Sequence, residues 1–335
     1  MSNTLFEITH WLENVSFVEF KKEIEEKLIG QEELTLVLSQ VYSYLDSVVY
    51  DRPINHNMII AAPSGSGKTE TYRVLKQYFK RKIPSLVVSI CDVSQVTASG
   101  FKGMEPTEIV NDFFRQNSSI GLCFLDEFDK KLIPSYTSQG DNISAEAQSN
   151  LLTIIEGIKL REKSRIVDTS NIMFIGMGSF NDFRSKHENA PTPIGFDREN
   201  DSPFAIDVIT KESIIDSGGL YELVGRFPII VNYNKLNEAS VKKVIKKIAQ
   251  NISNTYNCDI SIKPSFEAYL VKNAFSKFGC RLIDSIIREA VLREYAKSLT
   301  SNFDINDTLV ITLKDNGNYS HKFIKDNKIK EEYDY

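Results

Sequence analysis

Residues Met58–Thr71 read M-I-I-A-A-P-S-G-S-G-K-T-E-T, an apolar run followed by a glycine-rich turn and a helix-compatible segment. The run Met58–Ala61 predicts a buried strand, and 70–80 predicts a helix. A strand, a glycine-rich loop and a helix, closed by Gly67-Lys68-Thr69, form the P-loop arrangement that binds nucleoside triphosphates. An ordinary strand-to-helix turn is the alternative, but it does not explain Gly-Lys-Thr after an apolar run. We therefore expect a phosphate-binding loop.

The chemistry of this loop predicts which residues bind nucleotide. Backbone N–H groups wrap the phosphates, and the following helix directs its positive end at them. Lys68 would reach the β- and γ-phosphates, and the Thr69 hydroxyl would hold Mg²⁺. Ala62 occupies the place of the first glycine in the strict motif, which is tolerable because the turn mainly needs Gly65 and Gly67. The predicted nucleotide-binding residues are Pro63, Ser64, Gly65, Ser66, Gly67, Lys68, Thr69 and Glu70.

Composition describes a soluble globular protein. The chain has 335 residues, of which 41% are hydrophobic and 25% are charged, and this length favours two domains. Its formal net charge is −5, and a net negative charge does not attract duplex nucleic acid as the main partner. Local basic patches are compatible with this net charge.

Cysteine spacing and hydropathy exclude several classes of protein. The four cysteines form no C-x-x-C pair, so no zinc site is expected, and Cys91 and Cys123 lie in or beside apolar runs as small core residues would. The N-terminus has no basic segment leading into an apolar one, so we expect no signal peptide. No apolar run approaches the ~20 residues of a membrane helix. These features predict a cytoplasmic protein without a membrane span.

Strand-like and helix-like segments alternate after the P-loop. Runs at 85–90, 121–125 and 171–175 predict strands, and segments 106–114 and 144–156 predict helices. This alternation predicts an α/β fold with a parallel sheet and helices on both faces. Ligands of such sheets bind at the carboxyl ends of the strands.

The pattern changes near Leu236. Helical segments at 238–254, 264–277 and 281–299 are followed by one β-rich run, 309–313. This predicts a smaller, mostly helical second domain.

We therefore divide the chain into an N-terminal arm (1–27), a large ATPase domain (28–235) and a small lid domain (236–335). In the arm, Trp11 and its apolar neighbours could form an exposed docking patch or pack on the large domain, and packing is favoured.

The segment Gly121–Asp129, G-L-C-F-L-D-E-F-D, is typical of a Walker B strand. Four apolar residues precede two acids, so the strand would bring Asp126 to the sheet edge to hold Mg²⁺. Glu127 beside it suits a general base that polarises the attacking water. A lone Asp-Glu pair would be a solvated strand end, but both motifs in this order predict ATP hydrolysis.

These motifs resemble the AAA+ unfoldases of the ClpX type, with HslU as a relative, over roughly residues 26 to 300. The resemblance implies the P-loop AAA+ fold with its helical lid, and an enzyme that uses ATP and Mg²⁺. The matching segments are L-I-G-Q (28–31), A-P-S-G-S-G-K-T (62–69), G-F-K-G (100–103), L-D-E-F-D-K (125–130), the helix 145–157, V-G-R-F-P (224–228) and F-G-C-R (278–281).

The same resemblance implies roles for three residues near the phosphates. Ile29 would help to form the adenine pocket, Arg226 would be an arginine finger in the neighbouring subunit's site, and Arg281 would be the sensor 2 arginine. An arginine at the transferred phosphate stabilises developing charge. The alternatives are a surface ion pair for Arg226 and a charge at a helix start for Arg281. A finger supplied by a neighbour requires a ring, and the family forms homohexamers.

Three loops would contact polypeptides by resemblance. Phe101 and Lys102 fall where the family carries its aromatic pore loop, and an aromatic flanked by glycines can grip an extended chain by contact area. The alternative is that Phe101 packs in the core. Residues 135–144 would form a second pore-facing loop. Ile194, Gly195 and Phe196 fall where the family docks on a ClpP-type peptidase, unless they merely pack on their own domain.

Three departures from the family pattern suggest a specialised paralogue. No cysteine precedes Cys91, so the N-terminal zinc-binding domain of ClpX is absent from this sequence. A short basic stretch, 159–165, replaces an insertion and suggests a solvated hairpin. Either Ser179 or Asn181 could supply the sensor 1 group.

The resulting expectation is a ring-forming, ATP-dependent protein unfoldase that threads polypeptide through a central pore for a ClpP-type peptidase. Two alternatives stay open: a remodelling chaperone without a peptidase, and a nucleic-acid-associated or regulatory AAA+ ATPase. Nucleic acid and membrane are not expected as partners.

Overall fold

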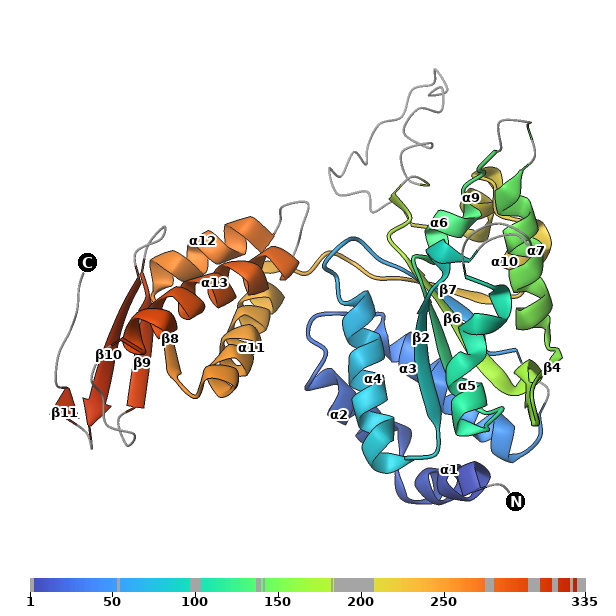
Figure 1. Cartoon of the computed structure of the whole chain (residues 1–335), viewed down its shortest axis with the longest axis horizontal. Coiled ribbons are helices and arrows are strands. Elements are labelled where there is room, and N and C mark those ends of the chain that lie inside the picture. Colours follow the sequence, from blue (N-terminus) through green and yellow to red (C-terminus); the bar gives the residue numbers. More distant parts are fainter. Residues whose placement is uncertain are drawn as a thin grey trace, which may run out of the picture. The chain divides into compact units, whose positions relative to one another are not determined.

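A computed structural model of the chain describes residues 3–52, 55–96, 104–136, 140, 142–181, 183, 208–274, 280–300, 308–314, 319–325 and 328–329. The chain forms two compact units, and the second begins at Leu236, where the sequence pattern changes (Figure 1).

The first unit is built on a parallel five-stranded sheet with the order β2-β3-β6-β1-β7. All four neighbouring pairs are parallel, which confirms the predicted α/β sheet. The strands are β1 (Met58–Ala61), β2 (Val87–Asp92), β3 (Gly121–Asp126), β6 (Ile172–Gly178) and β7 (Ile229–Asn232). The sequence patterns predicted all of these except β7. The carboxyl ends of β1, β3 and β6 therefore meet at one edge.

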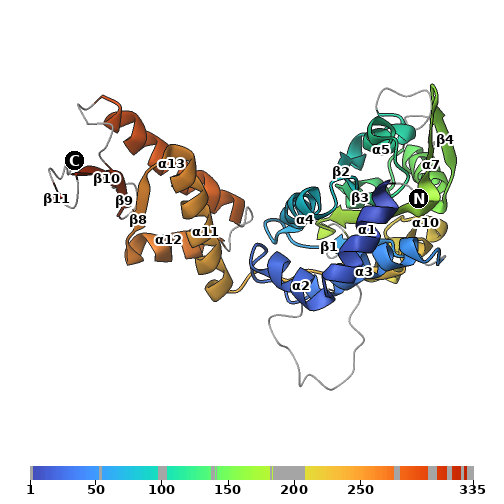
Figure 2. The ribbon, with the colours of Figure 1, turned by 90° about the horizontal axis from the view of Figure 1, so that it is seen from below.

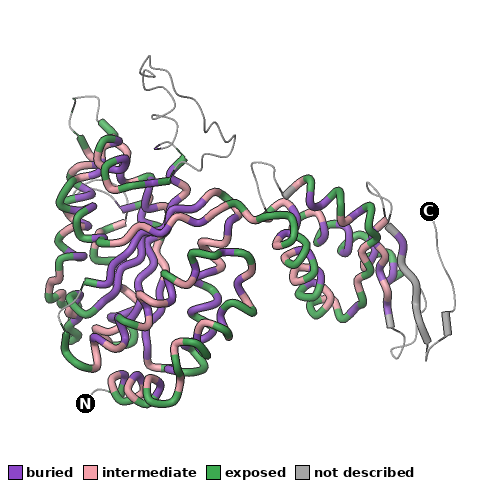
Figure 3. The backbone as a smooth tube through the Cα atoms, turned by 180° about the vertical axis from the view of Figure 1, so that it is seen from behind, coloured by how far each residue is buried: buried purple, intermediate pink, exposed green. Residues whose placement is uncertain are grey.

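Alternate residues of β1 enter two separate cores. Met58 and Ile60 belong to one hydrophobic cluster, and Ile59 and Ala61 belong to the other. This is expected of a strand that is covered on both faces. The strands are buried along most of their length, as the purple segments of Figure 3 show.

The first core is covered by the N-terminal helices and the P-loop helix. These are α1 (Asn3–Asn14), α2 (Phe17–Glu25), α3 (Leu34–Val49) and α4 (Lys68–Lys82). Helices α1 and α3 lie side by side in Figure 2. A capping box between Ser16 and Glu19 starts α2.

The arm (1–27) is therefore integrated into this first core. Trp11 is buried and its indole N–H donates to the Tyr78 hydroxyl of α4 at 3.0 Å. Packing, not an exposed patch, is the observed arrangement of Trp11.

The second core lies on the opposite face of the sheet. It is covered by α5 (Asn111–Gln116), α6 (Phe128–Leu132), α7 (Ile143–Glu156), α9 (Lys211–Asp216) and α10 (Tyr221–Gly225). The helix predicted at 106–114 is instead a 3₁₀ turn, η2 (Pro106–Val110), followed by α5. Two further 3₁₀ turns are η1 (Val93–Gln95) and η3 (Thr169–Asn171). The basic stretch forms the hairpin β4 (Lys159–Glu162) and β5 (Arg165–Asp168), which is largely exposed.

The described residues of the second unit form three helices and a four-stranded sheet. The helices are α11 (Glu238–Tyr256), α12 (Pro264–Ala274) and α13 (Cys280–Ser298), and the sheet has the order β11-β10-β9-β8. Its strands are β8 (Asp259–Ile262), β9 (Thr308–Leu313), β10 (Tyr319–Lys325) and β11 (Lys328–Ile329). Only β9 was predicted, because β8 and β10 carry polar residues where an apolar run would mark a strand. In the described part of the chain, no helix is both long and apolar enough to cross a membrane.

Candidate nucleotide site

The predicted phosphate loop connects strand β1, which lies between β6 and β7, to helix α4. Gly65 and Gly67 have φ angles of 78° and 100°, a region that side-chain-bearing residues seldom adopt. Ala62, by contrast, is buried and continues the sheet, because its N–H donates to the Gly178 carbonyl at 3.0 Å. This explains why alanine suits the first position of the motif while the later glycines are needed.

Two hydroxyl groups tie the loop to the neighbouring strand β7. The Thr71 hydroxyl donates to the Gly67 carbonyl at 3.0 Å, and it lies 3.1 Å from the hydroxyl of buried Tyr233. Since Thr71 has one proton, the Tyr233 hydroxyl is the donor of the second bond. The Tyr233 N–H also donates to the Ala61 carbonyl at 2.8 Å. Both ends of the loop are thus fixed to the segment that follows β7.

Lys68 begins α4 and folds back over the loop. Its ammonium donates to the Ala62 carbonyl at 2.6 Å and to the Pro63 carbonyl at 3.4 Å. The charge is therefore held at the carboxyl end of β1, where the P-loop chemistry requires it.

The Walker B acids stand at the end of β3, on the same sheet edge. Burial is the main cause that raises the pKa of Asp126, and the Glu127 charge adds to it. The Glu127 N–H and the Lys68 ammonium act in the opposite direction. The Lys68 ammonium, which donates to the Ala62 carbonyl just after β1, and Asp126, at the end of β3, thus lie on the same edge of the sheet.

Glu127 directly precedes α6, as its N-cap residue, with a left-handed φ of 55°. This conformation is uncommon for a residue other than glycine. Its carboxylate forms an ion pair with Lys130 at 2.9 Å and is 41% exposed, so it remains accessible to water.

The donor set fits a magnesium ion that arrives with its nucleotide. Among the described residues no group of three or more His, Cys, Asp or Glu side chains could hold a metal alone. Mg²⁺ typically takes one or two protein oxygens and completes its coordination with substrate phosphates and water. Thr69 and Asp126 offer one hydroxyl and one carboxylate, which match that requirement.

Asp129 is a functional candidate that the sequence patterns did not single out. This carboxylate is 5% exposed, and its Oδ2 accepts from the Ser179 N–H and hydroxyl at 3.0 Å each and from the Phe180 N–H at 2.8 Å. A Cβ on Gly178 would lie 2.6 Å from the Asp129 carboxyl group, so this position must be glycine. The only signal in the sequence is the third acid of L-D-E-F-D, which does not reveal its partner.

The contact with Asp129 separates the two sensor 1 candidates. The Ser179 hydroxyl already donates its proton to Asp129, so toward a phosphate oxygen it could offer only lone pairs. Asn181 is exposed and its amide carries two N–H donors. The chemistry therefore favours Asn181 as the group that would contact phosphate.

Arg226 lies at the C-terminal end of α10 and forms an ion pair with Glu156, the last residue of α7. The Asn55 amide donates to the Arg226 carbonyl at 2.9 Å and fixes its backbone. The surface ion pair considered for this arginine is therefore present within one chain.

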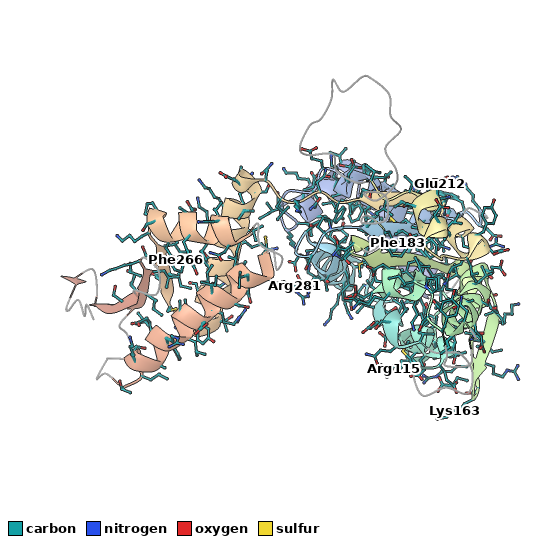
Figure 4. The ribbon with its side chains drawn as sticks, turned by 90° about the horizontal axis from the view of Figure 1, so that it is seen from above. Arg115, Lys163, Phe183, Glu212, Phe266 and Arg281 are labelled. Atoms are coloured by element: carbon teal, nitrogen blue, oxygen red, sulfur yellow. The ribbon has the colours of Figure 1, made fainter. Side chains whose placement is uncertain are left out.

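The remaining candidate residues occupy separate parts of the fold. Ile29 is half-buried beside Gly30, and the next residue, Gln31, exchanges hydrogen bonds with the Asn234 backbone at 2.9 and 3.2 Å. Arg281 is exposed in the first turn of α13, in the second unit (Figure 4).

The pore-loop residues Phe101 and Lys102 lie outside the described residues. The docking residues Ile194, Gly195 and Phe196 also lie outside them.

Comparison with known proteins identifies the class. Residues 58–185 match the family described as "ATPase family associated with various cellular activities (AAA)". The chain is an AAA+ ATPase, built on the P-loop sheet described above.

Its relatives place it beside one branch of that class. It is 28% identical over 268 residues to the ATP-dependent Clp protease ATP-binding subunit ClpX of Azotobacter vinelandii, an alignment that covers 68% of this chain and 60% of that protein. The ClpX of Treponema denticola is 25% identical over 84% of this chain, and the ClpX 2 of Wolinella succinogenes is 26% identical over 80%. This chain covers 74% of each of these two relatives. The chain is thus a ClpX-like AAA+ ATPase.

Proposed function

We propose that this ATPase is a protein unfoldase that assembles into a homohexameric ring and threads polypeptide through its pore. The observation that carries the proposal is the pairing of a P-loop with Asp126 and Glu127 at one sheet edge, in a chain similar to ClpX over most of its length.

The hydrolysis step follows from the side chains at that edge. Lys68 and the loop N–H groups would hold the β- and γ-phosphates, and Thr69 and Asp126 would hold Mg²⁺. Bound Mg²⁺ neutralises phosphate charge. The Glu127 carboxylate orients water and takes its proton as the water oxygen attacks the γ-phosphorus and the bond to the bridging oxygen breaks. The ion pair with Lys130 holds this carboxylate in place.

The arginines would complete the site from two chains. Arg281 would reach the phosphates from the lid of the same chain, and Arg226 would enter from the neighbouring subunit. Guanidinium groups at these positions stabilise the charge that develops on the transferred phosphoryl group. In this scheme hydrolysis requires the ring.

Hydrolysis would move the pore loop with Phe101 and Lys102 and pull an extended chain along the axis. Support comes from the glycine-flanked aromatic and from the name of the relatives, which describes a subunit of a protease. Ile194, Gly195 and Phe196 would dock on a ClpP-type peptidase. Nothing in the composition favours a compartment other than the cytoplasm.

The decisive experiment is a pull-down with Glu127→Gln in the presence of ATP. The variant should bind ATP but turn it over at least 100-fold more slowly, because a positioned general base contributes roughly 10²–10⁴-fold. It should then retain substrate polypeptide and partner. Lys68→Ala should lose nucleotide binding and capture nothing, which makes it the matched control. If Glu127→Gln hydrolyses ATP at the parent rate, the assignment of the base is wrong.

Two rival functions give different outcomes in the same assay. If the protein docks on a peptidase, deleting residues 193–196 should abolish capture of the peptidase while ATP turnover persists. If the parent sample captures no peptidase and the deletion leaves ATP turnover unchanged, a stand-alone chaperone is favoured. DNA-stimulated turnover with steep salt dependence would favour a nucleic-acid motor.

A further inference from the structure

The guanidinium of Arg226 is not directed freely outward in a single chain. Its Nη2 donates to Glu156 Oε1, and the two residues are 70 positions apart in the sequence. Glu156 is an acid that the sequence patterns assigned no role. The proposed arginine finger is therefore neutralised by its own subunit when no neighbour is present.

The backbone on both sides of this pair is firmly held. The Leu220 N–H, just before α10, donates to the side-chain oxygen Oε1 of Gln148 in α7 at 2.8 Å, and the side-chain Nε2 of Gln148 donates to the Gly218 carbonyl at 3.3 Å. Gln148 is 1% exposed. The buried side-chain amide of Gln148 holds α7 and the start of α10 together. The packing of these two helices therefore brings Glu156 and Arg226 close to each other.

The end of α7 that carries Glu156 is fixed as well. Thr169 donates to the Ile154 carbonyl at 2.7 Å and accepts from the Ile158 N–H at 2.8 Å. Gly157 ends the helix with a φ of 106°, and a Cβ there would lie 2.5 Å from Ser170 Oγ. Only the side chains of the pair are therefore free to change partner.

The pair is also weak enough to open. The side chains of Arg226 and Glu156 are 48% and 39% exposed, so water and salt screen their attraction. A nucleotide phosphate carries more charge than one carboxylate and accepts bidentate bonds from guanidinium. An exchange of Glu156 for another acceptor would therefore require movement of these two exposed side chains.

We propose that Glu156 is a positioning residue that retains Arg226 on its own subunit until a phosphate of the adjoining subunit displaces it. The inference rests on the proposed function, because it takes Arg226 as the finger of a ring. Glu156 thus sets how readily one subunit completes the site of the next.

The test compares steady-state ATP turnover of assembled rings. Glu156→Gln should raise turnover roughly two- to five-fold, the equilibrium equivalent of an exposed ion pair. Glu146→Gln is the matched control, since it removes an equal charge from an exposed position of the same helix and should leave turnover unchanged. The gain should shrink toward one-fold at high salt, because salt screens the pair in the parent protein.

The Arg226→Ala background separates the two ideas. Arg226→Ala should reduce turnover strongly, and adding Glu156→Gln should then have no effect. If Arg226→Ala has the turnover of the parent, Arg226 is not an arginine finger, and the proposed role of Glu156 is overturned as well. A second outcome is that Arg226→Ala is inactive but Glu156→Gln has the turnover of Glu146→Gln, or a turnover below that of the parent. In that case Arg226 remains the arginine finger, and only the proposed role of Glu156 is overturned. A gain that persists in the Arg226→Ala background or is independent of salt also overturns it.

Discussion

Asp129 accepts two hydrogen bonds from Ser179, one from its backbone N–H and one from its hydroxyl, each 3.0 Å long. Asp129 belongs to the helix that begins directly after Glu127, and Ser179 directly follows β6. The contact therefore joins the proposed general base to the segment that carries Asn181. Because the carboxylate is buried, this junction is stiff.

We predict that Asp129→Asn separates nucleotide binding from turnover. The amide keeps the shape but loses the charge, so the bonds to the Ser179 and Phe180 N–H groups weaken. Hydrogen bonds to charged groups contribute about 1.5–3 kcal/mol and neutral ones about 1 kcal/mol, so stability should fall by about 1–2 kcal/mol. ATP turnover should fall at least tenfold with little change in KM, because Asn181 and Glu127 lose their mutual alignment.

The measurement is ATPase kinetics together with urea denaturation. Asp112→Asn is the control, since Asp112 pairs with Arg115 on the exposed side of α5 and touches none of these groups. Parent turnover in folded Asp129→Asn would contradict the alignment role.

A second prediction concerns Trp11. Its ring packs against Phe20, Tyr78 and Phe79 at centroid distances of 5.4, 6.3 and 5.8 Å. Trp11→Ala should therefore lower the free energy of unfolding by about 3–5 kcal/mol, as large-to-small changes in a core do. Phe6→Ala, on the same helix but 65% exposed, should change it by less than about 0.5 kcal/mol. Equal urea midpoints for the two variants would show that α1 is a detachable arm.

The sequence was most informative where one local rule decides the structure. β1 has the predicted bounds because four apolar residues precede a glycine-rich turn, and Gly65 and Gly67 have the positive φ angles that the P-loop motif implies. Asp126 ends β3 because the apolar run of that strand stops there. Each of these features is encoded within a few neighbouring residues.

The contacts that complete the site could not be read in this way. Asp129 and Ser179 are 50 positions apart, and Arg226 and Glu156 are 70 positions apart. Such pairs depend on how strands and helices pack, which periodicity does not specify. β7 was missed for a related reason, since Ile229–Asn232 is a short strand directly after a proline.

The Tyr233 and Thr71 hydroxyls give a third prediction. Burial raises the pKa of Tyr233, so the phenol stays protonated and donates to Thr71 throughout the neutral range. Tyr233→Phe removes this donor but leaves the bond from Thr71 to Gly67. We expect a loss of about 1 kcal/mol in unfolding free energy and a weaker affinity for ATP, because α4 is less firmly held at the loop. Tyr50→Phe, at a 61% exposed site, is the control for both measurements. Unchanged nucleotide affinity in Tyr233→Phe would limit the hydroxyl pair to a role in folding.

His56 makes stability depend on pH. The ring is buried beside Tyr44, its Nδ1 lies 3.4 Å from Gln40 Oε1, and its Nε2 has no partner among the described residues. Burial lowers the pKa of His56 below its ordinary value near 6.5. As the pH falls through about 6.5, the unfolded chain therefore binds a proton before the folded one, and stability is lost. Above that pH the contribution is fully present.

Between pH 7.5 and 5.5, His56 can lower the free energy of unfolding by at most about 1.4 kcal/mol. This limit is the value of one pKa unit, because pH 5.5 lies one unit below the ordinary pKa of histidine. Urea midpoints of the parent should therefore fall over this interval by more than those of His56→Gln, which cannot titrate. His10→Gln, at an exposed position of α1, should keep the full pH dependence of the parent, because His56 is intact in it. If His10→Gln flattens the profile and His56→Gln does not, proton uptake at an exposed site, and not the burial of His56, sets the acid sensitivity of the ATPase domain.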